Sequence, residues 1–247
     1  TKLMVVAMLL VAALVVAPVA AARTVDTVFK PADGNTAYII SSGDTVYVGE
    51  KNLNFAAGTW SGPGVTTPLS GGYLAHFTDT GAGTTDVVVG IPNANDFELI
   101  SSDFGTTKGT YYVFAAGAPI AVGSEAGTVF VDIPKVTLDA VLNKSPVDSV
   151  NGKSVTRDNK LDFKLINNLA GFRGVAGNVP TMKIEVTLPG GGVTTKFGTV
   201  ELDKIPMTGE TQYRYGVDLE NEKAGSYSAV AKWPSSGPGA SFYGKNY

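Results

Sequence analysis

Few residues in this 247-residue chain could perform chemistry. The sequence contains one histidine, His76, and no cysteine. A Ser-His-Asp site needs a histidine between a nucleophile and an orienting acid, and no Gly-x-Ser-x-Gly motif occurs in the chain. Zinc would lack its usual thiolate and imidazole ligands. We therefore predict that His76 is an ordinary strand residue, that the catalytic site is absent, and that the protein is not an enzyme.

Pairs of carboxylates are the remaining candidates for catalysis. Glycoside hydrolysis uses two carboxyl groups and needs no histidine. Asp96 and Glu98 are two positions apart, as are Asp218 and Glu220, so each pair would share one face of a strand. This spacing is common by chance, and a hydrolase also needs a cleft between the two groups. A polysaccharide-degrading enzyme is therefore the least favoured of the functions considered.

Two polar loops contain oxygen ligands of the kind that extracellular calcium sites use. They are Asp33-Gly34-Asn35 and the segment from Asn93 to Asp96. Neither loop completes an EF-hand pattern, and both compositions are also typical of turns, which is the favoured interpretation. No cofactor and no metal site is predicted, and calcium is the one ion that these loops could take.

One possible modification site occurs in the chain. Asn143-Lys144-Ser145 matches the sequon for N-glycosylation. Pro146 follows the serine directly and makes the acceptor a poor one, and such short motifs also arise by chance. Asn143 is nevertheless the single residue for which the sequence predicts a covalent modification.

The first 22 residues have the features of an export signal. Lys2 precedes an uninterrupted apolar run from Leu3 to Ala17, and the small residues Ala20–Ala22 supply a cleavage site. The run is shorter than the roughly 20 residues that span a bilayer core. We predict a signal peptide over 1–22 and a mature chain that starts at Arg23. A retained anchor, a buried core helix and a pilin-like helix are the alternatives.

The composition excludes several classes of partner. Charged residues make up 17% of the chain and the net charge is −3, whereas nucleic-acid binding requires clustered Lys and Arg. No basic amphipathic helix is present that would bind a membrane surface, so no membrane contact is predicted after signal cleavage. Hydrophobic residues at 44% can build a core. Without cysteine, that core and assembly must supply the stability.

The first half after the signal shows alternating apolar residues, which is typical of β-strands. Val87, Val89 and Ile91 alternate with smaller or polar residues, so one face of such a strand would lie on a core. Clusters of Gly, Ser and Pro separate these runs and indicate turns. Pro134 is the best candidate for a domain boundary. The sequence predicts an N-terminal β domain over 23–134.

The second half has a more regular pattern, with about seven short strands. Leu161, Phe163 and Leu165 alternate with polar residues. Asn151-Gly152 predicts a hairpin, and Pro189–Gly192 predicts a turn between two strands. Such a series is typical of an immunoglobulin-like sandwich. We therefore predict an all-β fold with two β-sandwich-like domains, the second immunoglobulin-like and covering 135–247.

Short motifs in both halves suggest a family. Gly43–Glu50 reads GDTVYVGE, and the second half contains Leu161–Phe163, Asn167–Leu169, Val217–Leu219 and Gly225–Tyr227. In these motifs the chain resembles secreted surface-layer and sheath proteins of methanogenic archaea, most of all the tubular sheath proteins. The resemblance implies an extracellular protein at the cell surface and describes a fold rather than a reaction.

The predicted function follows from the resemblance and the composition. We predict a structural envelope protein whose partner is itself, assembling by β-edge contacts into hoops, a tube or a lattice. The alternative is a cell-surface adhesin or carbohydrate-binding module. That alternative would use surface aromatic residues, and the candidates are Trp60, Tyr73, Tyr111 and Tyr112.

Overall fold

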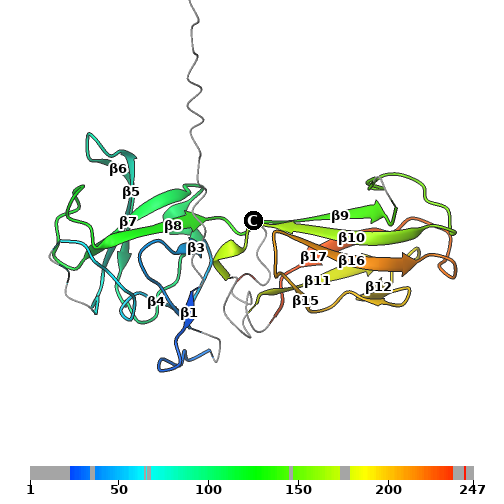
Figure 1. The fold of residues 1–247 in the computed structure, drawn as a ribbon, viewed down its shortest axis with the longest axis horizontal. Helices are drawn as coiled ribbons and strands as arrows, with labels where there is room; N and C mark the ends of the chain where they lie inside the picture. Colours follow the sequence, from blue (N-terminus) through cyan, green and yellow to red (C-terminus); the bar gives the residue numbers. More distant parts are fainter. Residues whose placement is uncertain are drawn as a thin grey trace, which may run out of the picture.

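The computed structural model describes residues 23–33, 37–63, 65, 68–144, 147–172, 179–235 and 242. The predicted signal peptide, 1–22, lies outside the described residues. Within them the chain is almost entirely β-structure, with several sheets and only two single-turn helices (Figure 1). The predicted all-β, sandwich-like fold is therefore confirmed.

Eight strands and one helical turn form what we call the N-terminal module. Its elements are β1 (Thr24–Val25), β2 (Tyr38–Ile39), β3 (Thr45–Tyr47), β4 (Leu53–Asn54), β5 (Gly72–Asp79), β6 (Thr84–Ile91), α1 (Ser101–Phe104), β7 (Gly109–Ala115) and β8 (Gly127–Asp132). A five-stranded sheet has the order β3-β8-β7-β5-β6, and a small sheet has the order β1-β2-β4. The larger sheet is antiparallel except where β3 pairs with β8.

The alternating residues of the N-terminal module divide between core and surface as the sequence predicted. Val89 and Ile91 of β6 are buried, whereas Val88 between them is exposed. Leu74 and Val113 on neighbouring strands belong to the same core. Because successive side chains of a strand point to opposite faces, this pattern fixes which face of the sheet covers the core.

Nine strands and one 3-10 turn form what we call the C-terminal module. Its elements are β9 (Val136–Leu142), β10 (Lys160–Asn167), η1 (Ala170–Phe172), β11 (Thr181–Thr187), β12 (Val193–Thr194), β13 (Lys196–Phe197), β14 (Val200–Glu201), β15 (Ile205–Pro206), β16 (Thr211–Asp218) and β17 (Ser228–Lys232). One sheet has the order β16-β10-β9, and β11 pairs with β17, β12 and β15 in another. Alternate residues such as Leu165 and Ile184 are fully buried between these sheets.

The two predicted turns of the second half differ in outcome. The turn at Pro189–Gly192 is confirmed, because the Leu188 amide donates to the Gly192 carbonyl at 2.7 Å and β12 then pairs with β11. Asn151 and Gly152 also form a turn, but no described strand pairs across it, so the hairpin prediction is wrong. Instead the segment before the turn pairs with β9, with the Val150 amide donating to Ala140 at 2.8 Å. The residues of a turn determine only the local backbone conformation. Which strand pairs with the segment beside the turn depends on the register of the whole sheet.

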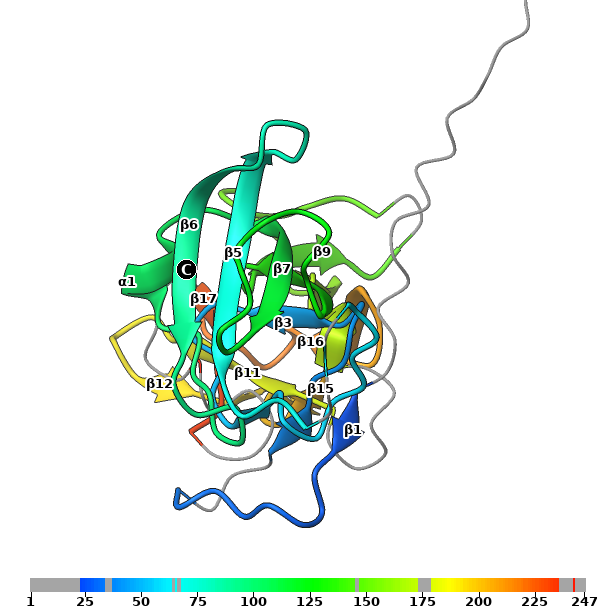
Figure 2. The same ribbon diagram turned by 90° about the vertical axis from the view of Figure 1, so that its left-hand side faces the viewer.

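The two modules lie end to end (Figure 1), and Figure 2 looks along that direction from the N-terminal module. β8 ends at Asp132 and β9 begins at Val136, so a short connection joins them. β3, an edge strand of the five-stranded sheet, lies next to η1 of the C-terminal module. β6, at the opposite edge, faces away from this junction.

Candidate assembly surfaces

His76, the only histidine, lies on β5 as predicted. Its Nδ1 is 2.6 Å from the Asp86 Oδ1 on neighbouring β6, and its ring is tilted against Tyr111 with centroids 5.2 Å apart. The hydrogen bond from His76 holds the pKa of the Asp86 carboxyl below its usual value. The histidine thus ties the outermost strand of the sheet to its neighbour.

The candidate carboxylates are engaged in surface contacts. Glu98 forms an exposed ion pair with Lys51 at 3.4 Å. Asp218 lies 3.7 Å from the Lys160 ammonium and accepts the Glu220 amide at 3.0 Å. Over the part of the chain that the structure describes, no three Asp, Glu or His side chains converge as metal ligands. The absence of an enzyme activity stays a prediction.

The two loops considered for calcium use side-chain oxygens in hydrogen bonds within the protein. The Asn93 side-chain oxygen accepts the Asn95 amide at 3.1 Å. Both oxygens of Asp33 accept from the Asn52 side chain at 3.2 Å. Residues 34–36 lie outside the described residues, so calcium binding at the first loop stays a prediction.

Asn143 is anchored to the neighbouring strand. Its amide nitrogen donates to the Asp162 Oδ1 at 2.8 Å, and the same oxygen accepts the Gly216 amide at 2.8 Å. Ser145 of the sequon lies outside the described residues. A glycan on this nitrogen would leave one N–H to keep the bond to Asp162, and glycosylation stays a prediction.

Two of the four candidate sugar-binding aromatics are unavailable to a ligand. Trp60 and Tyr111 are buried, and Trp60 stacks on Phe55 with centroids 5.8 Å apart. These two residues were wrongly expected at the surface, because they belong to the core that their β-rich segments build. Tyr73 is exposed, and Tyr112 is half-buried with its ring against Phe77.

The sequence did not single out a pair of tyrosines on β16. Tyr213 and Tyr215 stack with centroids 5.2 Å apart and an interplanar angle of 12°, and Tyr215 is 63% exposed. Residues two apart on a strand share a face, so the alternation alone could have located this pair. The neighbouring strand β10 adds Lys164 and the exposed Ile166 to the same face. We call Lys164, Ile166, Tyr213 and Tyr215 the β16 face; Arg214 pairs with the buried Phe163 and lies on the other side of the sheet.

The open edge of the five-stranded sheet carries exposed apolar residues. Val88 of β6 is 46% exposed, and Ile100, just before α1, is 47% exposed. Tyr73 of β5, directly opposite Gly90 of β6, is also exposed. We call Tyr73, Asp86, Val88, Ile100 and Asp103 the β6 border.

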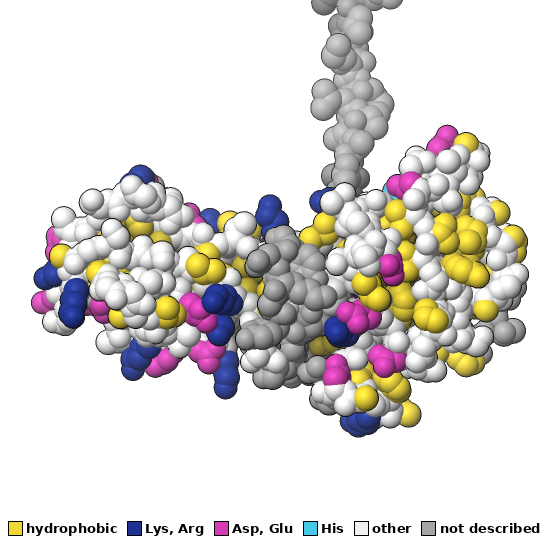
Figure 3. All heavy atoms as spheres, turned by 180° about the vertical axis from the view of Figure 1, so that it is seen from behind, with side chains coloured by type: hydrophobic (Ala, Val, Ile, Leu, Met, Phe, Trp, Pro, Cys, Tyr) yellow, Lys and Arg dark blue, Asp and Glu magenta, His cyan; other side chains and the backbone are white. Residues whose placement is uncertain are grey.

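The β6 border lacks most of the features that protect sheet edges from pairing. Lysine, proline and covering segments usually blunt such edges, but β6 contains no Lys, Arg or Pro. A bulge at the Asp86 end and the single turn α1, which lies beside β6, give partial protection. Figure 3 shows hydrophobic side chains gathered over this module, Lys and Arg mostly over the other, and Asp and Glu over both.

A buried ion pair fixes the N-terminal module at the junction. The Arg23 guanidinium donates to both Glu50 carboxylate oxygens and to the Thr45 carbonyl. Both side chains are almost completely buried. Burial raises the pKa of the Glu50 carboxyl, although Arg23 opposes that shift. A buried pair of this kind is costly to break, because either partner alone would be an uncompensated charge.

Aromatic rings from both modules surround this ion pair. The Arg23 guanidinium lies 5.8 Å from the Tyr47 ring and 5.1 Å from the Phe172 ring of η1. Tyr47 and Phe172 stack at 5.2 Å, and Phe242 packs against both. We call Arg23, Glu50, Tyr47, Phe172 and Phe242 the junction cluster.

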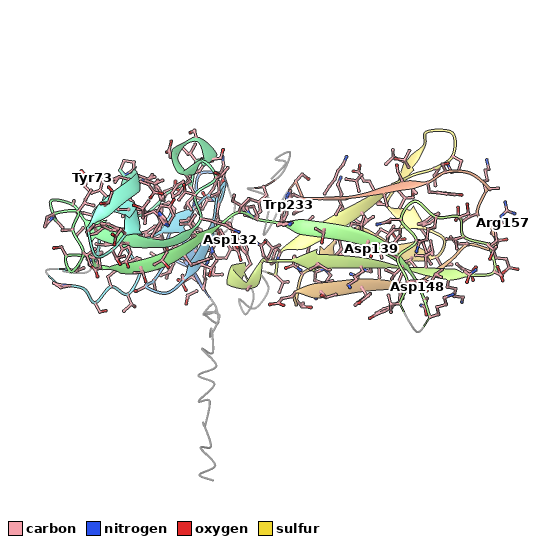
Figure 4. All side chains as sticks on the ribbon, turned by 90° about the horizontal axis from the view of Figure 1, so that it is seen from above. Tyr73, Asp132, Asp139, Asp148, Arg157 and Trp233 are labelled. Atoms are coloured by element: carbon pink, nitrogen blue, oxygen red, sulfur yellow. The ribbon has the colours of Figure 1, made fainter. Side chains whose placement is uncertain are left out.

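Hydrogen bonds close the junction on either side of the cluster. The Tyr47 hydroxyl donates to the Asn168 carbonyl at 2.7 Å and accepts the Gly171 amide at 3.0 Å. The Asn168 side chain donates to Asp132 at 2.9 Å, near the connection between the modules, where Figure 4 labels Asp132. A Cβ on Gly171 would lie 2.6 Å from the Thr45 carbonyl, so the modules approach too closely for any other residue there.

Comparison with known proteins identifies one family. The family profile described as "Domain of unknown function (DUF3821)" matches residues 42–236. No curated protein and no solved structure gives a match. The described residues contain no helix that is long and apolar enough to cross a membrane. The matched range covers most of both modules, whereas Arg23, β1 and β2 precede it and Phe242 follows it.

Proposed function

Because the chain belongs to the DUF3821 family, whose description states no activity, we propose a function from its surfaces. The protein is an extracellular structural subunit that assembles with copies of itself, by contacts between sheet edges, into a sheath or surface layer. The resemblance of its motifs to methanogen sheath and surface-layer proteins supports the same proposal. The proposed function includes no catalytic activity.

The β6 border carries this proposal. Its strand has unpaired backbone donors and acceptors on the side away from β5, except where α1 lies beside it. Apolar side chains at Tyr73, Val88 and Ile100 stand beside that edge. A strand from a second copy would pair with the backbone and cover the apolar side chains together. The new backbone hydrogen bonds and the burial of the apolar side chains both favour association of the two copies.

The rigid junction between the two modules supports the proposed role of a subunit that holds its neighbours at a fixed angle. The buried Arg23–Glu50 pair and the Tyr47 hydroxyl bonds join the two modules without a flexible linker. A lattice needs each contact to hold its neighbours at a constant angle. Two modules held rigidly end to end meet this requirement, whereas freely hinged modules would give irregular aggregates.

Lysine placed in the β6 border tests the proposal. Val88→Lys puts a charge where the second copy would pack, and we expect it to abolish sedimentable assemblies of the chain that starts at Arg23. Val28→Lys is the matched control, because Val28 is 90% exposed in the same module and lies outside the border. If Val88→Lys assembles as well as Val28→Lys does, the edge contact is wrong.

The Tyr213–Tyr215 pair favours a second candidate function, a carbohydrate-binding module or adhesin. Exposed aromatic rings are typical of sugar-binding surfaces, and Tyr215 is accessible. However, the two rings face one another rather than forming a flat platform. Retention on an insoluble polysaccharide that Tyr215→Ala abolishes, in protein that forms no assemblies, would favour this candidate over the first.

A further inference from the structure

The outer surface of the β16-β10-β9 sheet holds a buried carboxylate. Asp162 of β10 points away from the core, because Leu161 and Phe163 on either side of it belong to the core. Asp162 is nevertheless only 6% exposed. Charged side chains are almost never buried to this degree unless partners hold them. The groups that surround Asp162 on this surface therefore determine what its carboxylate can bind.

The described residues donate to only one of the two carboxylate oxygens. Oδ1 of Asp162 accepts the Asn143 side-chain amide and the Gly216 amide, each at 2.8 Å, and no described donor reaches Oδ2. Among the described residues, the fully buried side-chain atoms without a partner are the Arg23 Nε and the Tyr38 hydroxyl. Oδ2 of Asp162 is not one of them, so it can be reached from the surface. It is an acceptor that a ligand could use.

Asn143 adds hydrogen-bonding groups beside Asp162. Its nitrogen donates to the Asp162 carboxylate, and an amide carries a second N–H and a carbonyl oxygen. Asn143 is exposed, and no described residue bonds to either of these groups. Two acceptors and one donor are thus available side by side. Hydroxyl groups, which both donate and accept, match this set.

The Tyr215 ring stands next to these polar groups. The register between β10 and β16 shifts at Asp162, which places the bulge of Tyr215 and Gly216 opposite it. Tyr213 covers one face of the Tyr215 ring, yet Tyr215 is 63% exposed. Gly216 has no side chain, and a Cβ built on it would meet no atom within 4 Å. The ring face away from Tyr213 is therefore open beside the hydrogen-bonding groups.

We infer that Asn143, Asp162 and Tyr215 form a binding site for one ring of a neutral polysaccharide, and we call these residues the Tyr215 site. The apolar face of a sugar ring stacks on Tyr215, while its adjacent hydroxyls bond to Asp162 Oδ2 and to the Asn143 amide. The inference rests on the carbohydrate-binding candidate function and gives it a defined site. It also goes beyond self-assembly, since the β6 border lies on the other module. One subunit can thus hold a glycan and a neighbouring copy at once.

The charges around the site favour a neutral ligand. Lys164, the cation of the β16 face, lies directly opposite Asp139 of β9, which Figure 4 labels. The face therefore offers no surplus positive charge to a phosphate, sulfate or uronate group, and Asp162 would repel such groups. A cationic ligand would suit Asp162, but its binding would weaken as salt rises. Ring stacking and hydrogen bonds to a neutral sugar depend little on salt.

Calorimetric titration with defined oligosaccharides tests the site. The neutral probes are cellohexaose, mannohexaose and N-acetylchitohexaose, and the acidic probe is an oligogalacturonate. The protein is the chain from Arg23 with Val88→Lys, which keeps copies apart, made in a host that adds no glycan to Asn143. We expect a neutral probe to bind with the same affinity in about 0.1 M and about 1 M NaCl. The acidic probe should not bind.

Two substitutions in the same background separate the contacts. Asp162→Asn keeps Oδ1 and its two bonds but replaces Oδ2 with a donor. Tyr215→Ala removes the stacking ring. We expect each to weaken binding of the neutral probe at least about tenfold, whereas Tyr215→Phe should bind as before. Tyr73→Ala is the matched control, because Tyr73 is an exposed tyrosine of the other module. Circular dichroism checks that each variant is folded.

The outcomes separate this inference from self-assembly. If no neutral probe binds, or if Tyr215→Ala binds as tightly as Tyr73→Ala, the site is wrong. An affinity that Asp162→Asn leaves unchanged would remove the role of Oδ2, and one that is lost in about 1 M NaCl would indicate a charged ligand; either result contradicts the inference. All of these titrations use dispersed protein, so self-assembly is tested separately by sedimentation of the wild type.

Discussion

At the scale of single residues, the buried Arg23–Glu50 pair is the contact of the junction at which removal of one partner is expected to be costly. Glu50→Gln would leave the Arg23 guanidinium charged and uncompensated in the interior. We expect the free energy of unfolding in urea to fall by about 3–5 kcal/mol. Lys51→Met is the control, because its pair with Glu98 is exposed and should matter by at most about 1 kcal/mol. Equal effects of the two substitutions would contradict the assigned role of the junction cluster.

The burial of the Tyr47 hydroxyl leads us to predict that the stability of the protein depends on pH. Burial raises the pKa of Tyr47 to about 12, above the roughly 10 of an unfolded tyrosine. Between these values the unfolded chain loses the proton and the folded chain keeps it. The free energy of unfolding should therefore fall as the pH rises through this window, by up to about 1.4 kcal/mol per pH unit. Urea unfolding at successive pH values measures the slope, and Tyr47→Phe should reduce it.

Sequence reasoning could predict part of the junction and not the rest. Arg23 is the first residue that the structure describes, and Tyr47 lies in the motif Gly43–Glu50 on which the family resemblance rests. That the mature chain starts at Arg23 stays a prediction. The contact between Arg23 and Glu50 joins residues 27 positions apart. Strand periodicity says which face a residue occupies, but it carries no information about which distant charge is buried beside it.

At the scale of elements, strands with strict alternation were predicted well. β11 follows the pattern residue by residue, because its buried face must match a core. β10 follows it except at Asp162, which is buried between Leu161 and Phe163. The Asn151-Gly152 hairpin and the exposed positions of Trp60 and Tyr111 were wrong. Those errors share a cause, since turn composition and aromatic content are local signals whereas pairing and burial depend on strands far along the chain.

The bulge of β16 gives a prediction at the same scale. Gly216 has a φ of +76°, and the register between β10 and β16 shifts at this point. An L-residue in this conformation costs roughly 1–2 kcal/mol. Gly216→Ala should lower the free energy of unfolding by about that amount, measured by urea titration. Gly90→Ala on β6 is the control, because its φ is ordinary and no atom lies within 4 Å of an added Cβ, so an equal loss there would contradict this explanation.

At the scale of the whole molecule, residues 23–134 have a net charge of −7 and residues 135–247 a net charge of +3. This difference predicts that the proposed assembly depends on salt. Raising NaCl from about 0.1 M to about 1 M shortens the Debye length from about 10 Å to about 3 Å. Attraction between acidic and cationic modules weakens, so light scattering should show assembly at least about tenfold slower at the higher concentration. Faster assembly at high salt would indicate that apolar contacts alone drive association.

Electron microscopy of the chain that starts at Arg23, with and without calcium, tests the central claim most directly. The account predicts rings, tubes or sheets in which each repeat contains one end-to-end pair of modules. The Val88→Lys variant should give single particles on the same grids. Dispersed wild-type particles under every condition would contradict self-assembly and leave the binding-module function as the better account of the surface.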